Sequence, residues 1–258
     1  MPSSFPQVPS EPASAPISLD FRHLYRPAHS VGGDFFDVVK LDDQRAGVFI
    51  ADVMGHGARS ALVTAILRTL LQNLAAESSD PARFLSELNS HFHSVIRNSG
   101  ETIFVSAFYL VVDTRTATAR YASAGHPSPF VANRKTGDVR QLIPMLQRNP
   151  ALGILPRAKY DQWEEPVKAG DVFVLFTDGV HEAYNETGEE FGLTRLQDVI
   201  RAQLRSNGVD FPTAIVAAQQ TFIAPAQAAD DICIVALEVK QSTVEWRNTR
   251  SPSDTSAG

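Results

Sequence analysis

The sequence has little of what several large protein classes require. It contains one cysteine in 258 residues, so no disulfide framework can form within the chain, which is compatible with a reducing cytosol. Its formal net charge is −6, which argues against a general nucleic-acid-binding protein. No apolar run approaches the roughly 18 residues of a membrane span, and residues 1–20 lack the pattern of a signal peptide. We therefore expect a cytoplasmic protein that binds neither nucleic acid nor membranes.

Composition predicts one domain between two tails. Residues 1–18 are rich in proline, serine and alanine and are expected to be a disordered tail or linker. Residues 241–258 are polar and are expected to form a flexible tail. The segment 19–240 has no internal repeat and no second linker. The hydrophobic content of 43% is enough for a well-buried core.

Hydrophobic periodicity predicts an α+β fold, because paired helices stand beside runs of strands without strict alternation. The predicted helices are 58–77, 81–98, 193–205 and 212–222, and the predicted strands are 45–53, 102–113, 116–124, 129–134, 138–143, 171–178 and 232–239. Asp80 and Pro81 are the expected N-cap and first residue of the second helix. On the first helix, ordinary core packing would bury Leu62, Ile66, Leu70 and Leu74. Two sheets packed face to face with helices outside would place the strand-end turns at one edge.

Four acidic segments recur where apolar strands end. They are GGDFFD (32–37), ADVMGHG (51–57), FTDGV (176–180) and ADDICIV (229–235). Carboxylates from different strands can converge there on hard divalent cations. Any one segment alone is more simply a solvated turn, but four turns of this kind are a specific pattern. The pattern therefore predicts a metal site that uses no cysteine or serine nucleophile.

Each segment offers one or two candidate ligands. Asp34 follows two glycines, which allow a sharp turn, and Asp37 could join it or contact a metal-bound water. Asp52 ends a strand, where a bridging carboxylate and an exposed Val53 carbonyl are both feasible. Asp178 also ends a strand and precedes a glycine. Asp230 and Asp231 stand together before the last strand, and residue type alone does not separate them.

Two histidines lie in these turns. His56 is a candidate general acid for the leaving alkoxide, and His126 is expected to brace the AGHP loop rather than to act as an acid. Oxygen ligands favour Mg²⁺ or Mn²⁺ over zinc, which usually takes histidine or cysteine.

The order of these motifs resembles the metal-dependent Ser/Thr protein phosphatases (PPM, type 2C-like), in particular the bacterial SpoIIE/RsbU-type branch. The resemblance also includes SAGHPSPFV (123–131), LGI (152–154) and FTDGVHEA (176–183). It implies a four-layer α-β-β-α sandwich of two mainly antiparallel sheets flanked by helices. It also implies two Mn²⁺ or Mg²⁺ ions, with Asp52 bridging them. Asp34 and the Val53 carbonyl would bind one ion, and Asp178 and Asp230 the other, with Asp231 behind them.

The resemblance further implies a function and partners. The expected activity is hydrolysis of phosphoserine or phosphothreonine by water that two metal ions activate, with a small STAS-type anti-sigma-factor antagonist as the substrate in partner-switching regulation. The helices within 58–98 could form a homodimer contact. Cys233 stands where the family usually has Thr or Ser, so that a hydroxyl hydrogen bond near the last metal-binding aspartate could be missing.

Two alternatives remain at this stage. The same fold could be a non-catalytic phosphoprotein-binding regulator, although all the motif aspartates are present. The GGDFF segment is also similar to the signature of diguanylate cyclases, but there the signature lies in a hairpin well inside the domain, whereas here it opens the domain.

Overall fold

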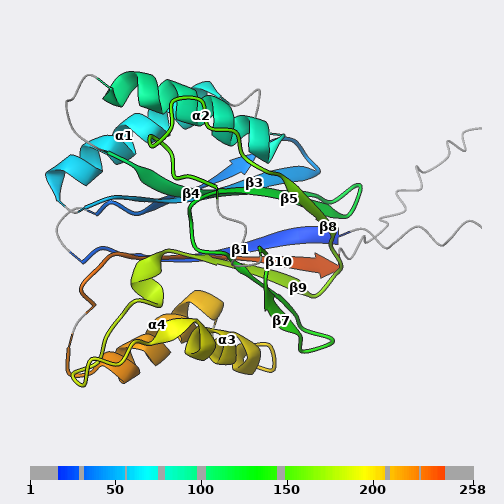
Figure 1. The fold of residues 1–258 in the computed structure, drawn as a ribbon. Coiled ribbons are helices and arrows are strands. Elements are labelled where there is room, and N and C mark those ends of the chain that lie inside the picture. The colour runs from blue at the N-terminus through cyan, green and yellow to red at the C-terminus, as the bar shows by residue number, and fades with distance from the viewer. Residues whose placement is uncertain are drawn as a thin grey trace, which may run out of the picture.

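The computed structural model describes residues 17–28, 32–55, 57–74, 79–97, 103–143, 149–206, 210–226 and 228–241. Its elements form four layers, with two antiparallel sheets in the middle and a helix pair on each outer face (Figure 1). This confirms the predicted α-β-β-α sandwich. No helix within these ranges is long and apolar enough to cross a membrane.

The first sheet, sheet A, has the strand order β1-β10-β9-β6-β7. Its strands are β1 (Ile17–Arg26), β6 (Phe130–Asn133), β7 (Val139–Gln141), β9 (Asp171–Phe176) and β10 (Ile232–Gln241). Two helices cover its outer face, α3 (Gly192–Gln203) and α4 (Phe211–Ile223). A short 3-10 helix, η2 (Asp178–Val180), follows β9.

The second sheet, sheet B, has the order β2-β3-β4-β5-β8. Its strands are β2 (Phe35–Lys40), β3 (Arg45–Val53), β4 (Val105–Asp113), β5 (Thr118–Ala124) and β8 (Trp163–Pro166), and its outer face carries α1 (Ala58–Asn73) and α2 (Pro81–Ile96). The predicted cap of α2 is confirmed, because the Asp80 carboxylate accepts a hydrogen bond from the Arg83 N–H at 3.0 Å.

Strand alternation divides the core into three apolar layers. On β3, Val48 and Ile50 face the other sheet, whereas Phe49 faces α1 and α2. On β9, Leu175 faces sheet B and Phe176 faces α3 and α4. Because successive side chains of a strand point to opposite faces, central strands of this sandwich are apolar on both sides. The acidic residues are thereby confined to strand ends.

Some sequence predictions differ from the structure. Strand β1 begins at Ile17, two residues before the predicted start of the domain. At α1, Leu74 is buried as predicted, and Ile66 and Leu70 are partly buried against the same core, whose buried α1 residues are Val63, Leu67 and Leu71. The prediction is wrong for Leu62, which is 64% exposed. The run ALVTAIL is apolar on both sides of the helix, and its periodicity therefore does not define one face.

Candidate active site

The four acidic segments meet at one end of the sandwich. Asp34 directly precedes β2, Asp52 lies near the end of β3, and Asp178 opens η2 after β9. Asp230 and Asp231 directly precede β10. The segments are tied across the strand pairs: the Val53 N–H donates to the Gly33 carbonyl at 3.3 Å, and the Thr177 N–H donates to the Cys233 carbonyl at 3.1 Å. The antiparallel pairing of β2 with β3 and of β9 with β10 thus brings the turns together.

Asp34 is the most deeply placed of these residues, at 5% exposure. Its carboxylate accepts a hydrogen bond of 2.5 Å from the Thr177 hydroxyl, which comes from the other sheet. The glycine before it allows a close approach, because a Cβ on Gly33 would lie 2.8 Å from the Val53 carbonyl oxygen. Asp34 and the Val53 carbonyl therefore belong to one tightly packed corner.

The carboxylates raise each other's pKa. Burial, together with the charge of Asp52, raises the pKa of Asp34 to about 10, against the opposing hydrogen bond from Thr177. Burial and the charges of Asp178 and Asp230 raise the pKa of Asp52 to about 7. Burial and then Asp230 raise the pKa of Asp178. Desolvation and like charges both disfavour the ionised forms of these carboxylates, so a cation at this cluster would stabilise them.

Asp230 and Asp231 differ in their surroundings. Asp231 is buried, and its two carboxylate oxygens accept hydrogen bonds from the N–H groups of Ala28 at 2.8 Å and Gly33 at 2.7 Å. Asp230 is exposed, and one of its oxygens accepts from the Asp231 N–H at 2.8 Å. Asp231 thus holds the loop before β2 against the start of β10. Asp230 keeps an oxygen for another partner.

The other sequence candidates lie as follows. Asp37 lies within β2 beside Phe49 and Phe84, away from the aspartate cluster, so the expectation that it could join Asp34 is wrong. Strand alternation turns it towards α1 and α2 rather than towards the end of the sandwich. His56 lies outside the described residues. Cys233 is fully buried among apolar side chains between the sheets, and burial raises the pKa of its thiol.

His126 braces its loop, as predicted. Its Nε2 lies 3.1 Å from the Phe176 carbonyl oxygen, and its Nδ1 lies 2.8 Å from the Ser106 hydroxyl. A carbonyl can only accept, so Nε2 carries the proton and Nδ1 accepts from Ser106. Burial lowers the pKa of His126 to about 3, which keeps the ring neutral. The ring therefore links β4 to β9 beside the cluster.

A cavity of about 340 Å³ opens at the aspartate cluster. Its lining includes Asp52 and Asp178 together with the polar side chains Ser106, Ser123, Ser128, Gln141 and His181. Sequence reasoning missed these residues and Thr177. Thr177 stands next to Asp178 in the FTDGV motif, which is the only signal that could have found it. Ser123, Ser128 and His181 lie within the motifs SAGHPSPFV and FTDGVHEA, whereas Ser106 and Gln141 lie outside any motif and come from distant segments.

The donor set fits a hard divalent cation. No three Asp, Glu, His or Cys side chains within the described ranges are arranged to hold one ion by themselves. The oxygens at this corner are those of carboxylates and of a backbone carbonyl. Mg²⁺ typically binds through one or two carboxylates and keeps several waters, so that this set does not require a closed cage of side chains.

The fold and this acidic corner together define a class, the PP2C-type protein phosphatase domains. The SiaA-PP2C domain of Pseudomonas aeruginosa matches with a TM-score of 0.74 and 27% sequence identity, covering 84% of this chain and 85% of that chain. The family model of Stage II sporulation protein E (SpoIIE) matches residues 42–240. The chain belongs to this SpoIIE family, which confirms the resemblance seen in its motifs.

Two curated relatives come from Bacillus subtilis (strain 168). Phosphoserine phosphatase RsbP is 27% identical over 217 residues, which are 84% of this chain and 51% of RsbP. Phosphoserine phosphatase RsbU is 31% identical over 182 residues, which are 70% of this chain and 51% of RsbU. The chain therefore spans about half the length of each relative.

Proposed function

We propose that this chain is a metal-dependent protein phosphatase that hydrolyses phosphoserine or phosphothreonine. The observation that carries the proposal is the cluster of Asp34, Asp52 and Asp178, whose pKa values are all raised and of which Asp52 and Asp178 line a cavity. Groups with such perturbed pKa values concentrate at functional sites. The names of RsbP and RsbU, both phosphoserine phosphatases, support the same reaction.

In this proposal, Asp52 would contribute to holding both of two Mn²⁺ or Mg²⁺ ions. Asp34 and the Val53 carbonyl would hold one ion, and Asp178 and Asp230 would hold the other. The hydrogen bonds that occupy both oxygens of Asp231 support the choice of Asp230. Ions bound there would lower the pKa of a coordinated water and offset charge on the phosphoryl oxygens.

The chain's own residues have three further roles. The Thr177 hydroxyl donates to one carboxylate oxygen of Asp34 and so fixes its orientation. The other oxygen of Asp34 takes no part in this hydrogen bond. Ser106, Ser123 and Ser128 line the cavity and can donate hydrogen bonds to a phosphoryl group or to the peptide that carries it. No lysine or arginine belongs to the described lining, so these hydroxyls and the ions would have to balance the phosphate charge.

The substrate and assembly remain part of the proposal. By resemblance, the substrate is a phosphorylated STAS-type protein in a cytoplasmic partner-switching pathway. A homodimer through α1 and α2 would cover Leu62 and Val95, which are large apolar side chains exposed on these helices.

Release of phosphate from p-nitrophenyl phosphate and from a phosphoserine protein tests the reaction, with Mn²⁺ and with EDTA. Asp52→Asn and Asp178→Asn should each lower the Mn²⁺-dependent rate by roughly 100-fold or more, because the bound ions contribute several kcal/mol of transition-state stabilisation. Asp37→Asn is the matched control and should keep the wild-type rate, because Asp37 lies outside the cluster. Full activity in both cluster variants would sink the proposal. Binding of the phosphoprotein without phosphate release would indicate the non-catalytic alternative.

A further inference from the structure

One buried amide holds the Asp178 turn from the side of α4. Gln219 is 1% exposed, and its Nε2 donates to the carbonyl oxygens of Gly179 at 2.7 Å and Val180 at 2.9 Å. The hydrogen bonds within the turn use the two preceding carbonyls. The Val180 N–H donates to the Thr177 carbonyl, and the His181 N–H donates to the Asp178 carbonyl. Gln219 therefore binds the two carbonyls that the turn itself does not use.

The opposite side of the turn packs against the segment of Asp230 and Asp231. A Cβ on Gly179 would lie 2.1 Å from the Asp231 carbonyl oxygen and 3.2 Å from the Asp230 Cβ. Only glycine allows this backbone-to-backbone approach. The turn is thus held between the Gln219 amide on one side and the start of β10 on the other, which fixes Asp178 relative to Asp230.

Packing alone does not explain an amide at this position. The neighbouring α4 residues Ile215, Val216 and Ile223 are buried and apolar. The Gln219 Oε1 is buried and makes no hydrogen bond within the part of the chain that the structure describes. Burying an unpaired acceptor costs stability, which an apolar side chain of similar size would avoid. What glutamine adds is two N–H donors directed at the turn.

We propose that Gln219 is a positioning residue that keeps Asp178 at the separation from Asp230 at which both carboxylates bind one divalent ion. This inference rests on the proposed function, because it assigns a task within the same metal site. Groups that orient metal ligands typically change metal affinity by about 10- to 100-fold when they are removed. Gln219 contacts the backbone of the turn rather than a carboxylate, so we expect the lower end of that range.

The first test compares Gln219→Met with Gln220→Met, the neighbouring exposed position on α4. Mn²⁺ binding is measured by calorimetry on folded protein. Gln219→Met should raise the Kd for Mn²⁺ by roughly 10-fold, and saturating Mn²⁺ should restore hydrolysis of p-nitrophenyl phosphate with an unchanged KM. Gln220→Met should leave the Kd at the wild-type value. A merely structural role would instead lower the midpoint of thermal unfolding and leave the Kd of the folded protein unchanged.

A second measurement uses the wild-type protein and covers the case in which Gln219→Met does not fold. In NMR spectra, the side-chain amide protons of Gln219 should exchange slowly with solvent and shift when Mg²⁺ is added, whereas those of Gln220 should do neither. An unshifted Gln219 amide on Mg²⁺ binding would overturn the positioning role.

The outcomes separate this inference from the proposed function. Wild-type protein that binds Mn²⁺ and releases phosphate, together with a folded Gln219→Met variant of equal Mn²⁺ affinity, overturns the positioning role alone. Wild-type protein that binds no Mn²⁺ and releases no phosphate overturns both.

Discussion

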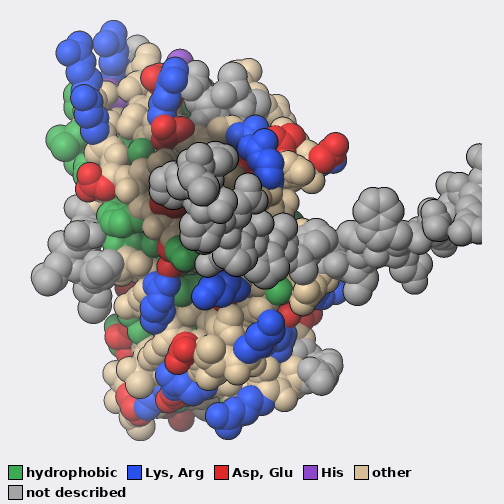
Figure 2. All heavy atoms as spheres, turned by 90° about the vertical axis from the view of Figure 1, so that its right-hand side faces the viewer, with side chains coloured by type: hydrophobic (Ala, Val, Ile, Leu, Met, Phe, Trp, Pro, Cys, Tyr) green, Lys and Arg blue, Asp and Glu red, His purple; other side chains and the backbone are tan. Residues whose placement is uncertain are grey.

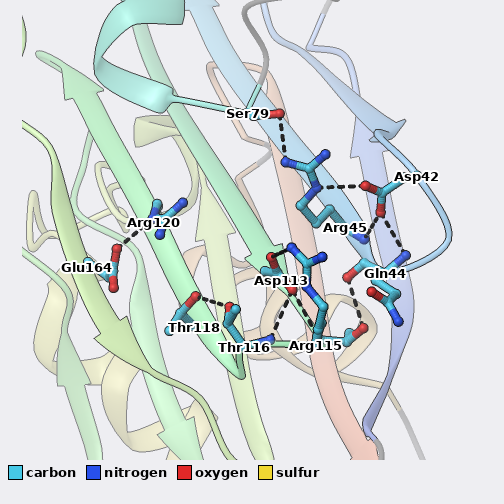
Figure 3. Close-up of polar contacts among 11 residues, drawn as sticks. Asp42, Gln44, Arg45, Ser79, Asp113, Arg115, Thr116, Thr118, Arg120 and Glu164 are labelled. Carbon is cyan, nitrogen blue, oxygen red and sulfur yellow. Dashed lines mark hydrogen bonds and ion pairs between the residues drawn. The ribbon is translucent and has the colours of Figure 1, made fainter.

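The two ends of sheet B use acidic residues in opposite ways. At the end formed by the start of β3 and the end of β4, carboxylates face guanidinium groups: Asp42 lies 2.8 Å from Arg45, and Asp113 lies 3.6 Å from Arg115 (Figure 3). At the other end, the charges that most affect Asp52 are those of Asp178 and Asp230. The first end, the paired end, is therefore neutralised by basic side chains. The second, the unpaired end, concentrates negative charge.

This difference separates ordinary surface chemistry from a specialised site. Acidic and basic side chains are interspersed on the paired end of the molecule (Figure 2). Exposed pairs of that kind contribute only about 0–1 kcal/mol each. Buried carboxylates without a cation instead cost stability, and proteins retain such costs mainly where function needs them. The comparison therefore indicates that the Asp52 end is built for an external cation.

The largest expected effect comes from Asp34→Asn at the unpaired end. We expect the Mn²⁺-dependent rate to fall by roughly 100-fold or more, because one ion loses a ligand. The metal-free variant should nevertheless unfold at a higher temperature than wild type at pH 8, because a buried acid with a pKa of about 10 is replaced by a neutral amide of similar shape. Calorimetric melting in EDTA and phosphate release test the two halves. A lower melting midpoint in EDTA would contradict the electrostatic argument.

The pH dependence of the metal-free protein should be the next largest effect. Asp34 and Asp52 have folded-state pKa values of about 10 and about 7, both above the ordinary value of 3.8. The folded state therefore binds these protons more tightly, so that their contribution to stability is complete below pH 4 and is lost as the pH rises through 7 and towards 10. Melting midpoints in EDTA should fall between pH 5 and pH 9, and Asp34→Asn should flatten the curve. A flat wild-type curve would show that the two acids are not coupled to folding.

A smaller effect is expected at Thr177, which connects the two sheets at this end. Its hydroxyl donates to Asp34 at 2.5 Å and accepts from the Cys233 N–H at 3.0 Å. Thr177→Val keeps the shape but removes both bonds, and it should cost about 1–3 kcal/mol of unfolding free energy and weaken Mn²⁺ binding. Thr177→Ser is the matched control and should keep most of both. Chemical denaturation and calorimetry provide the measurements, and equal behaviour of the two variants would refute the role of the hydroxyl.

Parts of the fold could be predicted because the local pattern and the final environment agree. Strand β3 was predicted with its observed bounds, Arg45–Val53, since its apolar run is buried on both faces. Strand β1 was missed because it is an edge strand with polar and exposed positions that follow a proline-rich segment. Strand β8 is short and ends in Pro166, so its pattern is weak. Element type follows from local periodicity, but edge strands depend on pairing with distant segments.

The acidic members of the site could be predicted, whereas their supports could not. Glycine and aspartate at strand ends give a local signal, as for Asp52 and Asp178. Thr177 and Gln219 act through contacts with residues 143 and 40 positions away, and nothing beside them in the sequence indicates these contacts. Cys233 illustrates the same limit: its side chain is buried between the sheets, and the hydroxyl that bonds to an aspartate of the cluster, Asp34, belongs to Thr177 directly after β9.

The smallest expected effect lies at the paired end and closes the comparison. Arg120 and Glu164 pair at 2.5 Å between β5 and β8, with side chains 43% and 48% exposed. Arg120→Gln should change the unfolding free energy by less than about 1 kcal/mol, because exposed pairs gain little over hydration. It should also leave the Mn²⁺ dependence of phosphate release unchanged, since it lies at the other end of the sheet. Denaturation at low and high salt checks the first expectation. A loss as large as that of Thr177→Val would mean that neutralised charges matter as much here as the unneutralised cluster, and the contrast between the two ends would fail.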